Sequence, residues 1–356
     1  MTHKKILIDL SPLRLGYCGL WEYAHQFGNT LLSINDPSEF DITFLAPSDH
    51  PFPKDAPVKI KPLSFFNRHV KFIAPRYDLY HALSHPSPFM PGRHFKGKCV
   101  ATIHDLNFLY EKSSSKIQKY LTRYQMALSR VDQLVFISHY AQKDAEKHLK
   151  FNVPSALIYN GVALAQEVEA RKPDRIELSG STFLFTVSTF MRKKNLHTIV
   201  QMMRSIPEYQ LVIAGKIIHT SYFEEVKHLV QKFNLERQVI FAGEINASEK
   251  AWLYSNCEAF LFPSIAEGFG IPPVEAMSYG KPVFVSNKTS LPEICGEDTF
   301  YWEDFQPEYM ANIFKTGMNS FCNTPDYPKR LKEHAARYSW QNNVLQHLDL
   351  YRKLLL

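Results

Sequence analysis

The 356-residue sequence predicts an α/β protein with two parallel-sheet domains, each with helices on both faces of its sheet. Short runs rich in Val, Ile and Phe alternate with amphipathic stretches of helical length along most of the chain. The runs are continuously apolar, as in strands that are buried on both faces. The alternation breaks once, over residues 166–181, where a polar and charged sequence is typical of a linker between domains.

The alternation divides the chain into a first domain over residues 1–165 and a second over residues 182–339. Parallel strands joined by helices require right-handed crossovers, as in Rossmann-like sheets. The predicted strands of the first domain are Lys5–Leu10, Asp41–Ala46, Cys99–Ile103, Gln133–Ser138 and Ala156–Tyr159. Those of the second are Thr182–Ser188, Gln210–Ala214, Gln238–Ala242, Glu258–Pro263 and Pro282–Ser286. The predicted helices include Leu20–Leu32, Ser114–Ser129, Tyr140–Leu149, Phe223–Phe233, Ala247–Ser255 and, within residues 340–356, Trp340–Leu354.

The composition agrees with a globular chain. Hydrophobic residues make up 45% of the sequence and charged residues 21%, which excludes wholesale disorder. No apolar stretch approaches the roughly 18 residues that a membrane-spanning helix needs. The five cysteines are widely spaced without a Cys-x-x-Cys pair, so we predict reduced thiols rather than a disulfide framework or a zinc site. These features favour a cytoplasmic protein.

Positive charge gathers in one stretch of the first domain. Residues 59–98 contain eight Lys and Arg against one Asp, with five Phe among them. Apolar residues from Leu63 to Ile73 fall at near-helical spacing, which fits an amphipathic helix on an anionic membrane, such as the inner face of the cell membrane. An ordinary helix with a solvated basic face explains the pattern equally well. Nucleic acid is the least favoured partner, because no nucleic-acid-binding motif accompanies the stretch.

The common nucleotide and metal signatures are absent. The loop after the first strand reads SPLRLGYCGLWEY and lacks Gly-x-Gly-x-x-Gly, which argues against a nicotinamide dehydrogenase. The sequence also lacks a P-loop, a His-Glu-x-x-His helix and an Asp-x-Asp motif. We therefore expect no cofactor and no catalytic metal held by these signatures.

Residues 258–296 form the most informative segment. A predicted strand ends in a loop with two glycines, and two prolines open the helix that follows. An anion is expected at this helix start, with backbone amides as donors, those of Phe269, Gly270 and Ile271. Two carboxylates eight positions apart would repel a phosphate. We therefore expect Glu275 to accept hydrogen bonds from a ribose diol and Glu267 to accept one from a sugar hydroxyl.

This segment resembles the Glu-x7-Glu signature of the GT-B-fold retaining glycosyltransferases of family 4. About 30 residues agree in register, from Pro263 to Gly296. Agreement continues outside the segment, at Thr102–Asp105, Phe136–Ser138, Asn160–Val162, Ser188–Leu196, Ile213–Lys216 and Phe241–Gly243. The resemblance implies two Rossmann-like domains that face each other across a cleft, with the final helix crossing back onto the first domain.

The resemblance also implies roles for single residues. Lys194 would neutralise the departing nucleotide diphosphate, with Arg192 or Lys193 assisting; a solvated basic turn is the alternative. His104 would support the diphosphate or a sugar hydroxyl, and Asp105 would either hold its tautomer or cap the next segment. The implied catalytic residues are His104, Lys194 and Glu267, and the implied donor-binding residues are Gly16, Gly19, Arg192, Lys193, Gly215, Lys216, Phe269, Gly270, Ile271, Glu275 and Leu291.

The chain departs from the family pattern at Glu22, where relatives commonly carry an arginine. Acceptor contacts attributed to that arginine therefore do not carry over. A turn glycine before a helix is the competing interpretation of Gly16 and Gly19, and a helix-capping Pro-Glu is that of Glu293.

The function implied is metal-independent, retaining transfer of a hexose from a nucleotide-diphosphate sugar to a glycan or lipid-linked glycan, in cell-surface polysaccharide synthesis. GDP-mannose is slightly favoured as donor, because Ser290-x-Pro-Glu293 is typical of mannosyltransferase-like members, and UDP-sugars stay open. Two alternatives are a nucleotide-sugar epimerase or hydrolase on the same fold, and a non-catalytic scaffold subunit. Loss of the two glutamates or of Lys194 would favour the scaffold, and all three are present.

Overall fold

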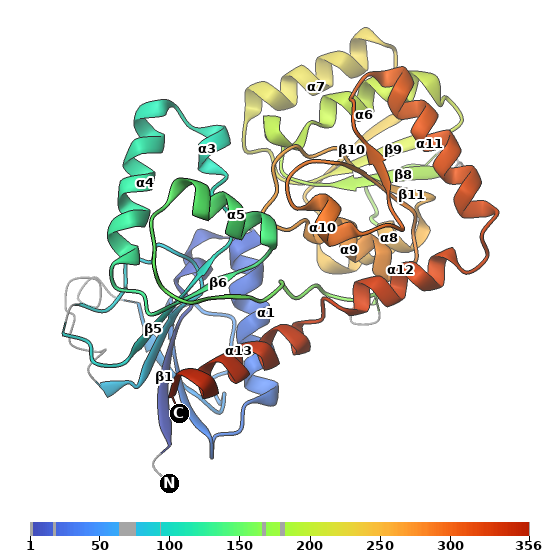
Figure 1. Cartoon of the computed structure of the whole chain (residues 1–356). Helices are drawn as coiled ribbons and strands as arrows, with labels where there is room; N and C mark the ends of the chain where they lie inside the picture. Colours follow the sequence, from blue (N-terminus) through green and yellow to red (C-terminus); the bar gives the residue numbers. More distant parts are fainter. Residues whose placement is uncertain are drawn as a thin grey trace. The chain divides into compact units, whose positions relative to one another are not determined.

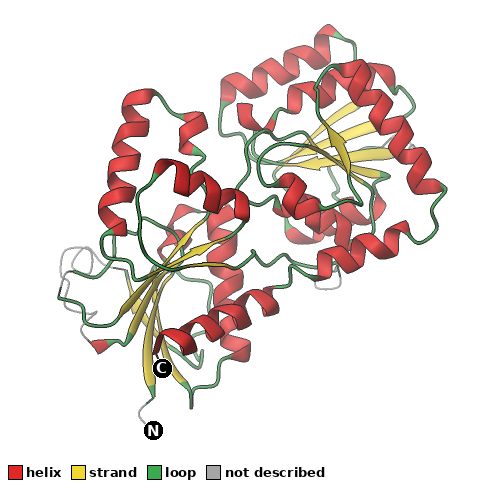
Figure 2. Cartoon of the chain, viewed as in Figure 1, coloured by secondary structure: helices red, strands yellow, loops and turns green. Residues whose placement is uncertain are grey.

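The computed structural model describes residues 3–16, 19–63, 76–92, 94–165, 169–178 and 182–355. The described chain divides into two compact units. The first unit comprises the residues up to Gly161 together with those from Tyr338 onward, and the second unit comprises Val162–Arg337. Within each unit the strands of one sheet lie between helices (Figure 2). Most of the amphipathic helix predicted over residues 63–73 lies outside the described residues.

The first unit contains a parallel sheet with the strand order β3-β2-β1-β4-β5-β6-β7 (Figure 1). The strands are β1 (Lys4–Asp9), β2 (Phe40–Ala46), β3 (Lys59–Pro62), β4 (Leu79–Ala82), β5 (Lys98–Ile103), β6 (Gln133–Phe136) and β7 (Ser155–Leu157). The helices are η1 (Ser11–Leu15), α1 (Gly19–Ile34), α3 (Phe108–Glu111), α4 (Ser114–Leu128), α5 (His139–His148) and α13 (Trp340–Leu355).

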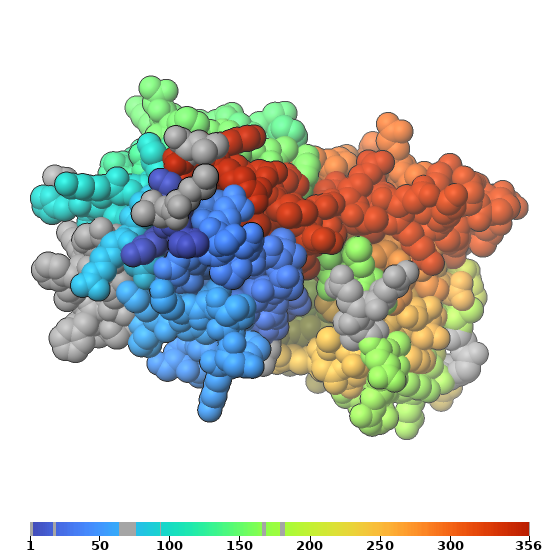
Figure 3. All heavy atoms as spheres, turned by 90° about the horizontal axis from the view of Figure 1, so that it is seen from below, coloured from blue at the N-terminus to red at the C-terminus, as the bar shows by residue number. Residues whose placement is uncertain are grey.

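Alternate residues of β1 face opposite sides of this sheet. Ile6 and Ile8 pack with residues of α1 and α13 in one core cluster. Leu7 belongs to a second cluster with residues of α4 and α5, among them Leu128. The C-terminal helix α13 therefore completes the core of the first unit, where it lies beside α1 (Figures 1 and 3).

The second unit contains a parallel sheet with the strand order β10-β9-β8-β11-β12-β13. Its strands are β8 (Phe183–Val187), β9 (Gln210–Ala214), β10 (Val239–Gly243), β11 (Ala259–Phe262), β12 (Val283–Ser286) and β13 (Phe300–Trp302). Its helices are η3 (Arg192–Lys194), α6 (Leu196–Met202), η4 (Met203–Ser205), α7 (Thr220–Lys232), α8 (Ala247–Asn256), α9 (Ile271–Ser278), α10 (Leu291–Cys295), α11 (Pro307–Cys322) and α12 (Tyr327–Ala336).

Both sheets have a point at which the strand order reverses direction. It lies between β1 and β4 in the first unit and between β8 and β11 in the second. Ligands of open α/β sheets bind at the carboxyl ends of the strands at such a point, where the connections from two neighbouring strands run to opposite faces of the sheet. In the second unit, the segments that follow β8 and β11 lie at this point.

The predicted fold class is confirmed, and each of the ten predicted strands is present with its ends within two residues of the expected positions. Strands β3, β4 and β13 were not predicted. They are three or four residues long, β3 carries two lysines, and β4 contains His81. His81 is fully buried, and its two ring nitrogens hydrogen bond to Tyr351 and Thr102. A buried strand that contains a polar residue with distant partners does not stand out in the sequence as an apolar run.

Candidate functional site

Two segments meet at the strand-order reversal of the second unit. One follows β8 and ends in η3, and the other follows β11. The carbonyl oxygen of Lys193 joins them, because it accepts hydrogen bonds from the amide of Ile265 at 2.8 Å and the hydroxyl of Ser264 at 3.2 Å. The backbone of the basic turn is thus fixed to the loop that contains Glu267.

Lys194 and Glu267, 73 positions apart in the sequence, form an ion pair across this junction. Both side chains are largely buried, with 14% and 12% of their surface exposed. The ammonium group also lies 5.3 Å from the centre of the Phe262 ring. A charge pair of this kind suits a ligand that offers phosphate oxygens to the lysine and a hydroxyl to the carboxylate.

Thr289 and Ser290, which precede α10, hydrogen bond to the loop after β11. The amide of Glu267 donates to Oγ1 of Thr289 at 3.1 Å. The hydroxyl of Ser290 lies 3.1 Å from the carbonyl oxygen of Glu267 and 2.9 Å from that of Phe269. Leu291, for which the resemblance implies a donor contact, is fully buried, and its amide donates to the carbonyl oxygen of Lys288 at 3.2 Å, so it supports the loop from within.

Gly270 connects this loop to α9 with a positive φ of 104°. A Cβ at this position would lie 2.6 Å from the side chain of Leu291, so glycine fits for both reasons. Helix α9 begins at Ile271, and Pro272 and Pro273, which carry no N–H, follow in its first turn. Among the described residues, the amides of Gly270 and Ile271 have no backbone acceptor, and they are available to an anion at the helix start.

Glu275 lies in α9 with 6% of its surface exposed. Its Oε1 accepts a hydrogen bond from Lys250 Nζ at 2.6 Å, and its Oε2 accepts one from the Tyr254 hydroxyl at 2.9 Å. Both donors belong to α8, one turn apart, and a capping box between Asn246 and Glu249 fixes the start of that helix. Burial, followed by the Glu275 charge, holds the pKa of Tyr254 well above its usual value, so the hydroxyl stays a donor.

The remaining implied residues of the second unit are Arg192, which follows β8, and Gly215 and Lys216, which follow β9. Arg192 pairs with Glu225 of α7, and its guanidinium lies 5.1 Å from the centre of the Tyr222 ring. Gly215 follows β9 with φ 136°, and a Cβ there would lie 1.8 Å from the carbonyl oxygen of Ser188. Lys216 is exposed beside it. Gly215 thus lets the chain after β9 pass close to the chain after β8.

His104 follows β5 in the first unit. Its Nε2 lies 2.7 Å from the carbonyl oxygen of Leu83, so this nitrogen carries the proton and Nδ1 is left as an acceptor. Burial lowers the pKa of His104 to about 4. The neutral ring fits the sugar-hydroxyl role better than support of a diphosphate. The carboxylate of Asp105 accepts hydrogen bonds from the amide and side chain of Asn107, which matches the capping alternative.

Gly16 and Gly19 flank the start of α1, and Gly16 has a positive φ of 69°. No heavy atom of the described residues lies within 4 Å of a Cβ built at either glycine. Sequence reasoning missed the residue that fixes this loop. Asp9 is buried at the end of β1, and its carboxylate accepts hydrogen bonds from the amide of Ser11 and the hydroxyls of Tyr80 and Ser87.

Two features are absent from the described residues. No group of three or more His, Cys, Asp or Glu side chains there is arranged to hold a metal ion. Over the same residues, no helix has the length and apolar character needed to cross a membrane.

Comparison with family models matches both halves of the chain. Residues 30–166 match the model described as Glycosyltransferase Family 4, and residues 169–338 match the model described as Glycosyl transferases group 1. The chain is a GT-B-fold member of glycosyltransferase family 4. The fold of HepE from Anabaena, in complex with UDP and glucose, is similar, with a TM-score of 0.75 at 16% identity over 99% of this chain and all of that one.

Curated relatives of this chain include mannosyltransferases. The chain is 28% identical to the serotype-specific mannosyltransferase WbdA of Escherichia coli over 283 residues, 72% of this chain and 34% of WbdA. It is 27% identical to the O-antigen chain mannosyltransferase RfbU of Salmonella typhimurium, over 68% of this chain and 65% of RfbU. The chain thus spans about a third of the length of WbdA.

Proposed function

We propose that this family 4 protein transfers a hexose from a nucleotide-diphosphate sugar to a glycan or lipid-linked glycan in cell-surface polysaccharide synthesis. The observation that carries the proposal is the ion pair of Lys194 and Glu267 at the strand-order reversal, beside the start of α9. GDP-mannose is the first candidate donor because WbdA and RfbU are mannosyltransferases. UDP-sugars are the second, because HepE binds UDP.

Each part of the site has a task in this reaction. The amides of Gly270 and Ile271 and the Lys194 ammonium bind the diphosphate, and Lys194 stabilises the charge that grows as the nucleotide leaves. Glu267 releases Lys194 to the phosphates and accepts a hydrogen bond from the hexose. Glu275, held by α8, accepts hydrogen bonds from the ribose diol. No metal ion takes part, so EDTA is expected to leave the rate unchanged.

The stereochemistry proposed is retention. The bond between the anomeric carbon and the donor phosphate breaks, and the acceptor oxygen bonds to the same face of that carbon. The acceptor proton passes to the departing phosphate oxygen, so the reaction needs no protein base. An NMR spectrum of the first product distinguishes the two anomers, and a product of inverted configuration contradicts this part of the proposal.

We propose the cytoplasm as the place of reaction, with the basic stretch 59–98 as a contact to anionic lipid. Flotation with vesicles that contain 30% phosphatidylglycerol, compared with neutral vesicles, tests this part.

Isothermal titration of GDP, UDP, ADP and CMP tests donor binding. One nucleoside diphosphate is expected to bind the wild type. Its affinity for Glu275→Ala should be at least about tenfold lower, which corresponds to about 1.4 kcal/mol of binding free energy. Binding of none of them, together with absence of hexose transfer, would favour the scaffold alternative.

A further inference from the structure

Thr289, in the turn between β12 and α10, has a backbone conformation that its side chain disfavours. Among the described residues, the non-glycine positions with positive φ are Asn195, Asn234 and Thr289, and the φ of Thr289 is 56°. Asparagine tolerates this left-handed region, whereas a β-branched side chain is crowded there. Strain of this kind persists only where the surrounding structure imposes it, so contacts outside the turn hold Thr289 in place.

The hydroxyl of Thr289 makes the contact that explains this conformation. Oγ1 donates its proton to the carbonyl oxygen of Lys288 at 2.8 Å, which leaves its lone pairs to accept. It accepts a hydrogen bond at 3.1 Å from the amide of Glu267, 22 positions earlier in the sequence. The left-handed backbone of Thr289 is therefore coupled to a hydrogen bond with the residue that pairs with Lys194.

Ser290 fixes the other backbone group of Glu267. Its hydroxyl is fully buried and lies 3.1 Å from the carbonyl oxygen of Glu267 and 2.9 Å from that of Phe269. Glu267 lies in the loop between β11 and α9, where the backbone has no ladder or helical partners to fix it. Two consecutive side chains after β12 thus hold the peptide groups on both sides of the Glu267 Cα.

The position of this backbone determines where the Glu267 carboxylate lies. The carboxylate pairs with Lys194, and both side chains are largely buried. A buried ion pair depends on close geometry, and a displacement of about 1 Å can lower a rate about a hundredfold. A loosened loop would therefore leave the fold in place and misalign the pair.

A turn that only reverses the chain would be served better by glycine. Glycine adopts a φ near 56° without strain, but it offers no side-chain acceptor to the amide of Glu267. Threonine at this position therefore indicates a use for the hydroxyl that outweighs the cost of the backbone conformation.

We propose that Thr289 is a positioning residue for hexose transfer: its strained turn presents the hydroxyl that, with Ser290, fixes the backbone of Glu267 and so aligns the carboxylate with the hexose. The inference rests on the proposed function for the role of Glu267. Thr289 acts on the chemical step rather than on nucleotide binding, because in that proposal the start of α9 and Glu275 hold the nucleotide.

Three substitutions separate the hydroxyl of Thr289 from the strain. Thr289→Val removes the hydroxyl and keeps the strain, Thr289→Gly removes both, and Thr289→Ser keeps the hydroxyl. In initial-rate assays with GDP-mannose and UDP-hexoses, the Val and Gly variants are expected to lose at least about tenfold in kcat, with KM changed less than about threefold. The Ser variant should lose less than about threefold in kcat, and titrated GDP or UDP should bind all three variants within about twofold of the wild type.

The melting temperature separates this role from a purely structural one. Thr289→Gly should melt at a higher temperature than Thr289→Val, because glycine relieves the strain, although both variants are equally slow. A residue that served only stability would lower the rate and the melting temperature together.

Hydrogen exchange measures the loop without reference to activity. Exchange is followed by mass spectrometry in peptides that contain Glu267. It should be at least about tenfold faster in Thr289→Val and Thr289→Gly than in the wild type, and unchanged in Thr289→Ser, because only the first two remove the acceptor of the Glu267 amide.

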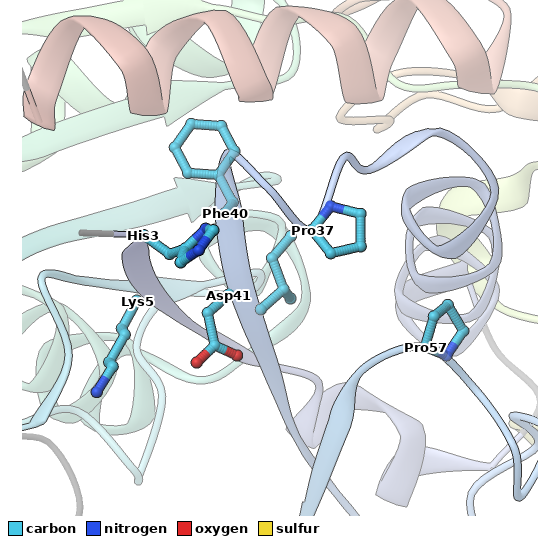
Figure 4. Close-up of a pocket in the computed structure, with 7 residues that line it drawn as sticks. His3, Lys5, Pro37, Phe40, Asp41 and Pro57 are labelled. Carbon is cyan, nitrogen blue, oxygen red and sulfur yellow. The ribbon is translucent and has the colours of Figure 1, made fainter. Parts of the chain in front are cut away.

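Two control variants each remove a different side-chain hydrogen bond to a carbonyl oxygen. Thr299→Val is matched in chemistry, because Thr299 is buried in the same unit and its hydroxyl donates to Cys295 at 3.0 Å. His3→Ala is remote: His3 lines a hollow at the amino ends of β1 and β2, where it lies 2.7 Å from the carbonyl oxygen of Ser38 (Figure 4). Both should leave kcat and the exchange of the Glu267 loop unchanged.

Three results would overturn the proposal: a kcat of Thr289→Val within threefold of the wild type, equal losses in Thr289→Ser and Thr289→Val, or a fall in GDP or UDP affinity as large as the fall in kcat. The last result would place Thr289 in nucleotide binding. Failure of the proposed function is distinguishable, because the wild type then transfers no hexose while exchange of the Glu267 loop still responds to Thr289→Val; the role in hexose transfer falls with it.

Discussion

Removal of the Lys250 ammonium is predicted to weaken binding of the donor nucleotide through its ribose. Glu275 has a side chain with 7% of its surface exposed, and Lys250, 33% exposed, supplies one of its two side-chain donors at 2.6 Å. Hydrogen bonds to charged groups contribute about 1.5–3 kcal/mol. Because Lys250 is partly solvated, we take the lower part of that range, about 1.5–2 kcal/mol. Lys250→Met should therefore cost this much stability, and a displaced carboxylate should bind the ribose about tenfold more weakly.

The assay is a double-mutant cycle between protein and ligand. Titrations compare the wild type and Lys250→Met with a nucleoside diphosphate and its 2′,3′-dideoxy analogue. The tenfold difference should appear with the ribonucleotide and shrink below twofold with the analogue, which has no diol for Glu275 to bind. Lys227→Met on the exposed side of α7 is the control. An equal loss with both ligands would refute the reasoning, because Lys250 would then act only on the stability of the second unit.

Three further outcomes are expected. Arg192→Ala should lower the transfer rate less than tenfold, against at least a hundredfold for Lys194→Met, because Arg192 pairs with Glu225; equal losses in initial-rate assays would contradict this. Gly215→Ala should lower the free energy of unfolding in urea by more than Gly243→Ala does, because a Cβ at Gly215 would lie 1.8 Å from the carbonyl oxygen of Ser188 and a Cβ at Gly243 would meet no atom of the described residues. A larger loss of stability in Gly243→Ala would contradict this reasoning. Stability should fall as the pH drops from 6.5 to about 4, because burial lowers the pKa of His347 to about 4 and the unfolded chain therefore takes up the proton first. His347→Gln should flatten that slope in denaturant titrations, and an unchanged slope would count against it.

The sequence predicted the positions of most strands because their side chains are apolar on both faces of each sheet. Ile6, Leu7 and Ile8 illustrate this, since all three are buried although they face opposite layers. Strand β4 escaped prediction because His81 obtains its partners from β5 and from α13, which begins about 260 positions later. Interactions between residues this far apart along the chain leave no pattern in the local sequence.

The loops of the candidate site were predictable from the sequence, but the residues that hold Glu275 in position were not. Glu267, Gly270 and Glu275 lie in one continuous motif, so their spacing places them at a strand end and a helix start. The role of α8 was hidden, because Lys250 meets Glu275 only through the tertiary fold. The four-residue spacing of Lys250 and Tyr254 on a predicted helix was the one available signal that they share a face.

Initial rates of hexose transfer test the role proposed for the pair of Lys194 and Glu267. Rates with GDP-mannose and UDP-hexoses are measured for the wild type, Lys194→Met, Glu267→Gln and the double variant, whose neutral pair avoids an unpaired buried charge. Each variant is expected to lose at least a hundredfold in rate, about 2.7 kcal/mol in the barrier, while its melting curve stays cooperative. Rates within tenfold of the wild type, in folded variants, would contradict it.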